Sequence, residues 1–195
     1  MNTKKVEQYW RDKMCDWNTE YFLNRGCENR RMVISALSRI RFGSLLEIGC
    51  NCGPNMMNII EAYPRAEIVG IDINSGAIEM ARGLLPQRVL DLEVSTADDI
   101  PFSDKSTDVV LSYNLLMYIG DDKINKVMTE IKRVVRNHII FFEPHSENAW
   151  EIHKTNIKKR HQCTRNYKKL LERYGFWDIK IEGPYNSISL ITARI

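Results

Sequence analysis

From Leu45 onwards, short continuous apolar runs alternate with segments whose apolar residues recur every three or four positions. The runs predict buried strands, and the spaced segments predict amphipathic helices. The predicted strands are 45–48, 67–72, 89–94, 108–112 and 139–143. The predicted helices are 54–63, one capped by Asn74 or Ser75, and one after Asp121 and Asp122. Repeated strand–helix units with continuous apolar strands favour an α/β, doubly wound, mostly parallel sheet with helices on both faces.

Both ends of the chain depart from this alternation. Residues 1–42 have aromatic residues at helical spacings and predict an N-terminal helical appendage to a single domain over residues 43–195. Its aromatic residues predict either a lid or the buried face of a helix. Near the other end, Thr164 is the expected cap of a helix, and residues 177–182 and 187–193 predict a β-hairpin with its turn at 183–186. A hairpin makes its strands antiparallel, so we expect the last strand to oppose the others.

The composition says more about the cellular compartment of the protein than about its function. The 195 residues are 44% apolar and 27% charged, with a net charge of +3, which is ordinary for one domain and does not itself call for nucleic acid. Five scattered cysteines form no disulfide framework and favour a reducing cytoplasm. The first residues lack the apolar core of a signal peptide, and no apolar run approaches the roughly 18 residues of a membrane span.

The candidate ligand site begins where the first strand gives way to a glycine loop. Gly49 and Gly53 flank the loop, and Pro54 suits the first position of the following helix, so backbone N–H groups can face a polar or anionic ligand. A dinucleotide site would want G-x-G-x-x-G, but here the glycines are four apart with Asn51 between them. Asp72 ends the next strand beside the loop, where it can accept hydrogen bonds from a ribose.

Two further features of this loop have competing interpretations. Glu47 is a carboxylate in an apolar strand, so it needs a partner, either a cationic ligand group or backbone amides of the loop. Cys50 and Cys52 form a C-x-C pair, but no second pair at a zinc spacing supports it, so we expect small packing residues and no metal.

Four segments together resemble one known family. Glu47-x-Gly49-x-x-x-Gly53, Val69-Gly70-Ile71-Asp72, Ala97–Phe102 and Asp108–Ser112 are similar, in order and spacing, to class I S-adenosylmethionine-dependent methyltransferases, nearest to the small-molecule branch. The resemblance covers roughly residues 43–143. The terminal hairpin is similar to the end of that family's seven-stranded sheet, whose last strand is antiparallel.

The resemblance implies S-adenosylmethionine as cofactor, S-adenosylhomocysteine as product, and a role for each matching residue. Gly49 and Gly53 would wrap the methionine part, with Asn51 in place of the usual middle glycine. Asp72 would bind the ribose, Ile73 would pack on the adenine, and Ala97 and Asp98 would lie at the adenine edge, beside a Thr96 where many members have an acid. Ser112 and Tyr113 would lie beside the sulfonium, and Glu47 is the remaining cofactor-binding candidate.

Catalytic residues are harder to name because methyl transfer mainly needs positioning. His145 follows Glu143 and Pro144 at a strand end, where ligands of open α/β sheets bind, and is either a general base or an exposed loop histidine. With Tyr113 and Glu143 it completes the catalytic candidates. Arg30 or Arg31 could pair with the cofactor carboxylate or be solvated at a helix start.

The sequence thus predicts an enzyme, an S-adenosylmethionine-dependent methyltransferase that acts on a small-molecule acceptor, in a pocket formed by the first 30 or so residues and the 144–163 segment. The basic stretch 152–173 leaves open an anionic acceptor, or an enzyme that modifies RNA or protein. A non-catalytic protein that binds the cofactor is the other alternative, and a dehydrogenase is a distant one. The sequence does not indicate the oligomeric state.

Overall fold

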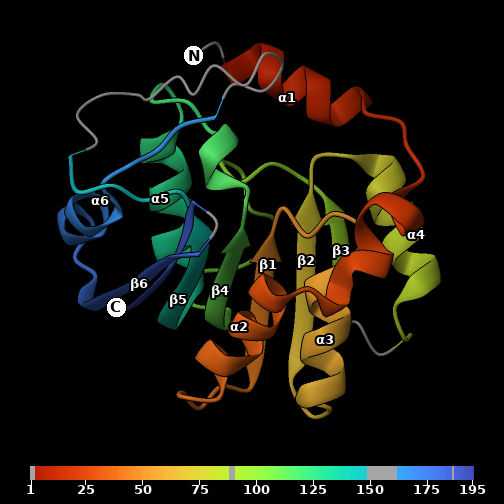
Figure 1. Ribbon diagram of the computed structural model, residues 1–195, viewed down its shortest axis with the longest axis horizontal. Helices are drawn as coiled ribbons and strands as arrows, with labels where there is room; N and C mark the ends of the chain where they lie inside the picture. Colours follow the sequence, from red (N-terminus) through yellow and green to blue (C-terminus); the bar gives the residue numbers. More distant parts are fainter. Residues whose placement is uncertain (1–2, 88–90, 149–161, 186) are drawn as a thin grey trace.

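The sheet of this protein has seven strands in the order β3-β2-β1-β4-β5-β7-β6. The computed structural model describes residues 3–87, 91–148, 162–185 and 187–195 (Figure 1). The strands are β1 (Ser44–Ile48), β2 (Glu67–Asp72), β3 (Asp91–Val94), β4 (Thr107–Tyr113), β5 (Val135–Glu143), β6 (Trp177–Tyr185) and β7 (Ile188–Arg194). Strands β1 to β5 pair in parallel, and β7 is antiparallel to both β5 and β6. The predicted fold class, with its antiparallel last strand, is confirmed.

Helices cover both faces of the sheet. The helices are α1 (Thr3–Asp12), α2 (Glu28–Leu37), α3 (Pro54–Ala62), α4 (Ser75–Leu84), α5 (Ile124–Val134) and α6 (Tyr167–Arg173). The apolar residues of α2, α3 and α4 share one buried cluster with one face of the sheet, and those of α5 and α6 share another with the opposite face. The fully buried Leu46 and Val110 on the central strands explain why these strands are continuous apolar runs.

The N-terminal segment lies across one end of the sheet. Figure 1 shows α1 crossing above the end toward which β2 and β4 point, which is the carboxyl edge of the parallel strands. After α1 the chain forms a π-helical turn, Asn18–Phe22, and a 3₁₀ turn, Leu23–Gly26, before α2 begins. The described residues 3–40 are therefore mainly helical, although in short pieces.

Several element boundaries differ from those predicted. Helix α6 is capped by Asn166, whose Oδ1 accepts a hydrogen bond from Lys169 N at 3.0 Å, and not by Thr164. Strand β5 begins at Val135, four residues before its apolar core, because its polar first residues pair with β4 and β7 near the rim of the sheet. The predicted turn at 183–186 falls partly within β6, which continues to Tyr185 through an irregular register after Glu182.

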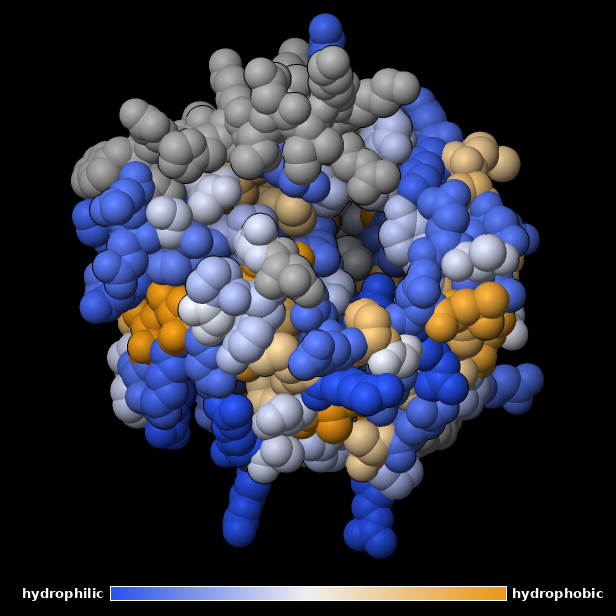
Figure 2. Space-filling view, in the orientation of Figure 1, coloured by the Kyte–Doolittle hydropathy of each residue, from blue (hydrophilic) through white to orange (hydrophobic). Residues whose placement is uncertain are grey.

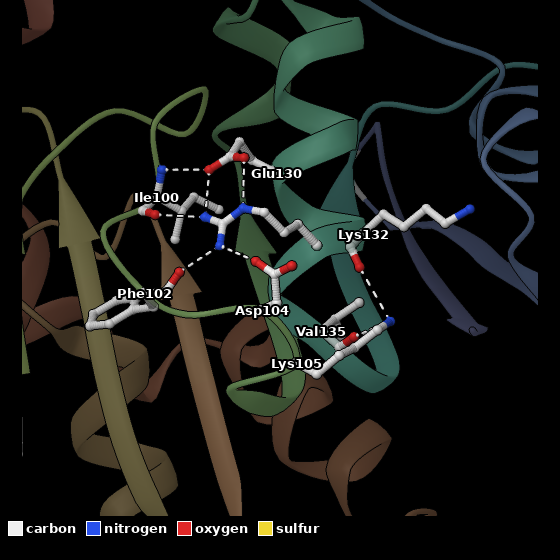
Figure 3. A network of polar contacts seen from close by, with 8 residues as sticks. Ile100, Phe102, Asp104, Lys105, Glu130, Lys132 and Val135 are labelled. Atoms are coloured by element: carbon white, nitrogen blue, oxygen red, sulfur yellow. Dashed lines mark hydrogen bonds and ion pairs between the residues drawn. The ribbon is translucent and has the colours of Figure 1, made fainter.

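One polar network fixes the connection between β3 and β4 against α5. The guanidinium of Arg133 donates to the backbone oxygens of Ile100 and Phe102 at 2.8 and 2.7 Å and pairs with Glu130 and Asp104 (Figure 3). Glu130 in turn accepts a hydrogen bond from Ile100 N at 3.0 Å. A bidentate arginine that bonds two carbonyls holds a loop more rigidly than side-chain packing alone. The network thereby fixes the loop that carries Ala97.

Candidate functional site

The glycine loop after β1 turns tightly against β2. Gly49 N and Cys50 N both donate to Ile71 O, at 2.8 and 2.9 Å. Gly49, Asn51 and Gly53 have φ angles of 71°, 54° and 82°, all in the left-handed region. Asparagine tolerates this region better than other residues with a side chain, so Asn51 replaces a glycine without breaking the loop. At Gly53, a Cβ would stand 2.7 Å from Leu85 Cδ1, so this glycine is also required by packing.

Asp72 is held at the carboxyl end of β2 by the neighbouring backbone. Its two carboxylate oxygens accept hydrogen bonds from Asn51 N and Asn74 N, each at 2.9 Å. Burial raises the pKa of Asp72, although these hydrogen bonds oppose the shift. The carboxylate therefore has a fixed orientation at the cavity described below, with lone pairs left for a ligand.

Glu47, Asn55 and Arg30 form a chain of polar contacts on the other side of the loop. Glu47 is 1% exposed, its Oε1 accepts from Asn55 Nδ2 at 2.7 Å, and its Oε2 has no partner. Burial raises the pKa of Glu47 to about 8. Asn55 Oδ1 accepts a hydrogen bond from Arg30 Nη1 at 2.6 Å. The Arg30 guanidinium also lies 4.7 Å from the centre of the Tyr113 ring. A carboxyl group and a guanidinium are thus bridged by one amide.

These groups surround a cavity of about 250 Å³. Figure 2 shows the surface recessed in this region, between α1 and the ends of β1 and β2. The floor is made by the glycine loop and by the carboxyl ends of the strands. The roof, defined here as residues 6–21, contributes Val6, Glu7, Trp10, Trp17 and Tyr21. Trp10, Trp17 and Tyr21 line the cavity, and Trp17 is also buried in the core, whereas Tyr9 is exposed.

Comparisons with known proteins agree with this geometry. Residues 45–138 match the family model described as a methyltransferase domain. Magnesium protoporphyrin IX methyltransferase from Synechocystis PCC 6803, solved with bound S-adenosylhomocysteine, aligns with all of this chain and 99% of its own, at a TM-score of 0.70 and 13% identity. Human N-acetylserotonin methyltransferase, solved with S-adenosylmethionine, aligns with 98% of this chain and 65% of its own, at a TM-score of 0.69 and 16% identity. This chain has the class I methyltransferase fold.

Curated relatives match more locally. Trans-aconitate 2-methyltransferase of Enterobacter sp. (strain 638) is 32% identical over 85 residues, which are 42% of this chain and 34% of that protein. The same-named enzyme of Afipia carboxidovorans is 25% identical over 124 residues, which are 62% and 45% of the two chains. The chain thus spans less than half the length of these relatives.

The methyltransferase fold brings most of the predicted cofactor residues to the cavity. Those that line it are Glu47, Gly49, Asn51, Asp72, Ile73, Ala97 and Tyr113. Gly53, Asp98 and Ser112 are not among the lining residues. Gly53 begins α3, and Ser112 turns its hydroxyl to Glu143 at 2.7 Å. The Asp98 carboxylate lies 3.4 and 3.6 Å from the ammonium groups of Lys123 and Lys126, so it faces α5 and not the cavity, whereas Thr96 lines the cavity.

The catalytic candidates separate in the same way, since only Tyr113 of the three lines the cavity. His145 points toward the start of α6, where its Nδ1 accepts from Tyr167 N at 3.2 Å, and burial lowers its pKa. The expectation that His145 is a general base is therefore not supported by the geometry. A position just after a strand predicts that a residue lies at the carboxyl edge of the sheet, where ligands bind. It does not predict the direction of the side chain, particularly after a proline.

Glu143 is fully buried and anchors the loop after β4. Its two oxygens accept four hydrogen bonds, from Ser112 Oγ and from the backbone N–H groups of residues 115, 116 and 117, at 2.7 to 3.0 Å. Burial raises its pKa to about 7 despite these bonds. All its contacts are internal, so Glu143 shapes the wall beside Tyr113 and does not itself reach the cavity.

Three residues of the site were missed or left open by the sequence. Asn55 and Asn74 were not singled out as ligand-site residues, because their partners lie on distant segments. Arg30 lines the cavity, whereas Arg31 is exposed, which decides between the two arginines. One signal in the sequence could have pointed to Asn55. It is the second residue of the helix that follows the glycine loop, and from there its side chain reaches back to Glu47 on the preceding strand. Residues 152–161 of the basic stretch lie outside the described part of the chain, whereas 162–173 are described and include α6.

Proposed function

We propose that the protein is an enzyme that transfers the methyl group of S-adenosylmethionine to a small-molecule acceptor. The observation that carries the proposal is the pair formed by Glu47 and Arg30. Glu47 has an unpaired oxygen, and no ion pair joins Arg30 to a carboxylate of the described residues. A buried carboxyl oxygen and a half-buried guanidinium of this kind need partners. The α-ammonium and α-carboxylate of a methionine moiety supply one partner for each.

The adenosine half has its own supports on the same wall. The fixed Asp72 carboxylate suits a ribose diol, and Ile73 and Ala97 provide apolar surface for the adenine, as the family resemblance implies. A nicotinamide dinucleotide also has a ribose but has no amino-acid end. The Glu47–Asn55–Arg30 chain therefore favours the sulfonium nucleoside over the dinucleotide.

The chain's role in the reaction is chiefly to position and to exclude water. Bound S-adenosylmethionine supplies an activated methyl group for in-line attack by a nucleophile. The acceptor must be held about 3 Å from that methyl, and a roof of aromatic residues suits this demand. Burial raises the pKa of Tyr113 to about 12, so the phenol keeps its proton at neutral pH. Tyr113 therefore orients the acceptor and does not remove its proton.

A small acceptor is supported by the enclosed cavity and by the relatives named trans-aconitate 2-methyltransferase. An anionic acceptor remains part of the proposal, since that name denotes a carboxylate substrate in those proteins.

None of the described helices is long and apolar enough to cross a membrane. A cytoplasmic setting is also proposed, supported by five cysteines, none of which forms a disulfide.

The test is the formation of S-adenosylhomocysteine from S-adenosylmethionine with a panel of acceptors, measured by mass spectrometry. The panel contains trans-aconitate, other small carboxylic acids, phenols and amines, with total RNA as a separate arm. We expect product with at least one small acceptor. Product with RNA alone would contradict a small-molecule acceptor, and tight cofactor binding without turnover on any acceptor would favour the non-catalytic alternative.

Replacing Arg30 with methionine should weaken S-adenosylhomocysteine binding about 10- to 100-fold, because a charged hydrogen-bonding partner of the carboxylate is lost. Methionine keeps much of the apolar contact with Tyr113. The control ligand is 5′-methylthioadenosine, which has the same nucleoside without the amino-acid end, and its affinity should change less than threefold. Equal losses for both ligands would show that Arg30 shapes the whole cavity instead of binding the carboxylate.

A further inference from the structure

Asn74 attaches the roof to the nucleotide side of the cavity, in addition to the contact of Cys52 Sγ with Trp17 O at 3.4 Å. Asn74 follows Asp72 by two positions and is 3% exposed. Its Nδ2 donates to the backbone oxygens of Trp10 at 2.7 Å and Lys13 at 2.9 Å, with a longer contact to that of Arg11 at 3.3 Å. Three carbonyls of the segment that ends α1 therefore converge on a single amide group.

The orientation of this amide is fixed by its surroundings. Asn74 Oδ1 accepts from Ala77 N at 2.9 Å and so caps α4. Rotating the amide by 180° would set its oxygen against three carbonyl oxygens and its NH₂ against an N–H group. The network thus settles which end faces the roof. Both ends are used, one for the helix and one for the roof.

The backbone of Asn74 joins this attachment to the ribose site. Asn74 N donates to Asp72 Oδ1 at 2.9 Å, so the same residue orients the Asp72 carboxylate and holds the roof. Trp17 lies against the same turn, since a Cβ on Gly76 would stand 3.6 Å from its Nε1. The other end of the roof is fixed by Glu7, which pairs with Lys123 at 2.6 Å, and the start of α1 before it is held by Thr3, whose Oγ1 accepts from Gly120 N at 3.1 Å.

We propose that Asn74 is a positioning residue that ties the roof to the nucleotide-binding edge and so retains the bound cofactor. This rests on the proposed function, because the retained ligand is the one assigned there to Asp72. Trp10 and Trp17 line the cavity, and Asn74 fixes the backbone oxygen of Trp10. A ligand beneath these rings leaves only when the segment moves, and the movement breaks the Nδ2 hydrogen bonds.

Asn74 has two roles, capping α4 and holding the roof, and a single substitution can remove the second while it keeps the first. Serine, threonine and aspartate also cap helices, but none presents an NH₂ group to three carbonyls. Asn74→Asp keeps an acceptor for Ala77 N and favours the positive end of α4. It also places a carboxylate oxygen against the three carbonyls, so the cap remains while the attachment is lost.

The test compares Asn74→Asp with Asn166→Asp. Asn166 is a matched control, because it caps α6 and donates from Nδ2 to Glu147 O at 2.8 Å, away from the lining of the cavity. We expect Asn74→Asp to speed S-adenosylhomocysteine dissociation about tenfold or more in stopped-flow tryptophan fluorescence, from the loss of two or more hydrogen bonds. Asn166→Asp should stay within twofold of wild type.

A second readout does not need the cofactor. Trypsin cleavage after Arg11 and Lys13 should be faster in unliganded Asn74→Asp than in wild type, and unchanged in Asn166→Asp. Unchanged dissociation together with unchanged cleavage would overturn the proposal, and so would faster cleavage with wild-type dissociation. If wild type binds no S-adenosylhomocysteine, the proposed function fails, and cleavage alone then decides whether Asn74 holds the roof.

Discussion

Asp72→Ala is expected to weaken S-adenosylhomocysteine binding about 100-fold or more, the largest loss from any single change at this site. The variant removes a charged acceptor for two ribose hydroxyls and leaves Asn51 N and Asn74 N without their partner. Hydrogen bonds to charged groups contribute about 1.5–3 kcal/mol each, which accounts for a loss of this size. The measurement is isothermal titration calorimetry of both proteins at the same pH.

Asp98→Asn is the control for this result, because the family resemblance placed both carboxylates at the adenosine. The structure turns Asp98 toward Lys123 and Lys126, so its affinity should stay within about threefold of wild type. Thermal unfolding of each variant shows whether the fold is retained. A loss for Asp98→Asn as large as for Asp72→Ala would mean that the adenine edge extends to Asp98 after all.

Glu47→Gln is expected to stabilise the unliganded protein at pH 8 while weakening its cofactor binding. Burial raises the pKa of Glu47 from 4.5 to about 8, so between these values the folded state holds a proton that the unfolded state has released. Stability of the wild type therefore falls as pH rises from about 4.5 to 8. Glutamine resembles the protonated carboxyl group and escapes this loss. The gain should reach about 4 kcal/mol near pH 8 and vanish near pH 4.5, measured by urea unfolding.

Glu47→Gln should also change the number of protons that the protein releases when it binds the ligand. The ligand's ammonium needs an ionised Glu47, so binding near pH 7 should release close to one proton from wild type and markedly less from Glu47→Gln. Calorimetry in buffers of different ionisation enthalpy measures this release. Equal proton release by the two proteins would place the ammonium elsewhere, and a stability gain that does not depend on pH would show that the buried carboxyl is not the cause.

The sequence predicted most of the scaffold because burial determines it. Continuous apolar runs such as 108–112 lie in the middle of the sheet, and Gly49 and Asp72 occupy strand ends whose position follows from the topology. Asn51, which the sequence placed in the position of a loop glycine, has a φ of 54°, a left-handed conformation that asparagine tolerates. These features depend on local chain geometry, which periodicity and residue type reveal.

What failed depends on direction and on distant partners. His145 and Glu143 both lie at the carboxyl edge, but one turns to α6 and the other is consumed by four internal hydrogen bonds. Asn74 acts through carbonyls some 60 residues earlier in the chain, as the contact with Trp10 O shows. No pattern in the neighbouring residues signals such a contact. The terminal cap of α6 was misplaced by two residues because Thr164 and Asn166 are both good caps.

The most direct test of the central claim is calorimetric titration of the wild-type protein with S-adenosylmethionine, S-adenosylhomocysteine and NAD⁺ under one set of conditions. The Glu47–Asn55–Arg30 chain and Asp72 predict that both sulfur nucleosides bind one site per chain, with dissociation constants in the micromolar range or below, whereas NAD⁺ binds at least about 100-fold more weakly. Absence of binding by both sulfur nucleosides, or tighter binding of NAD⁺, would contradict the account.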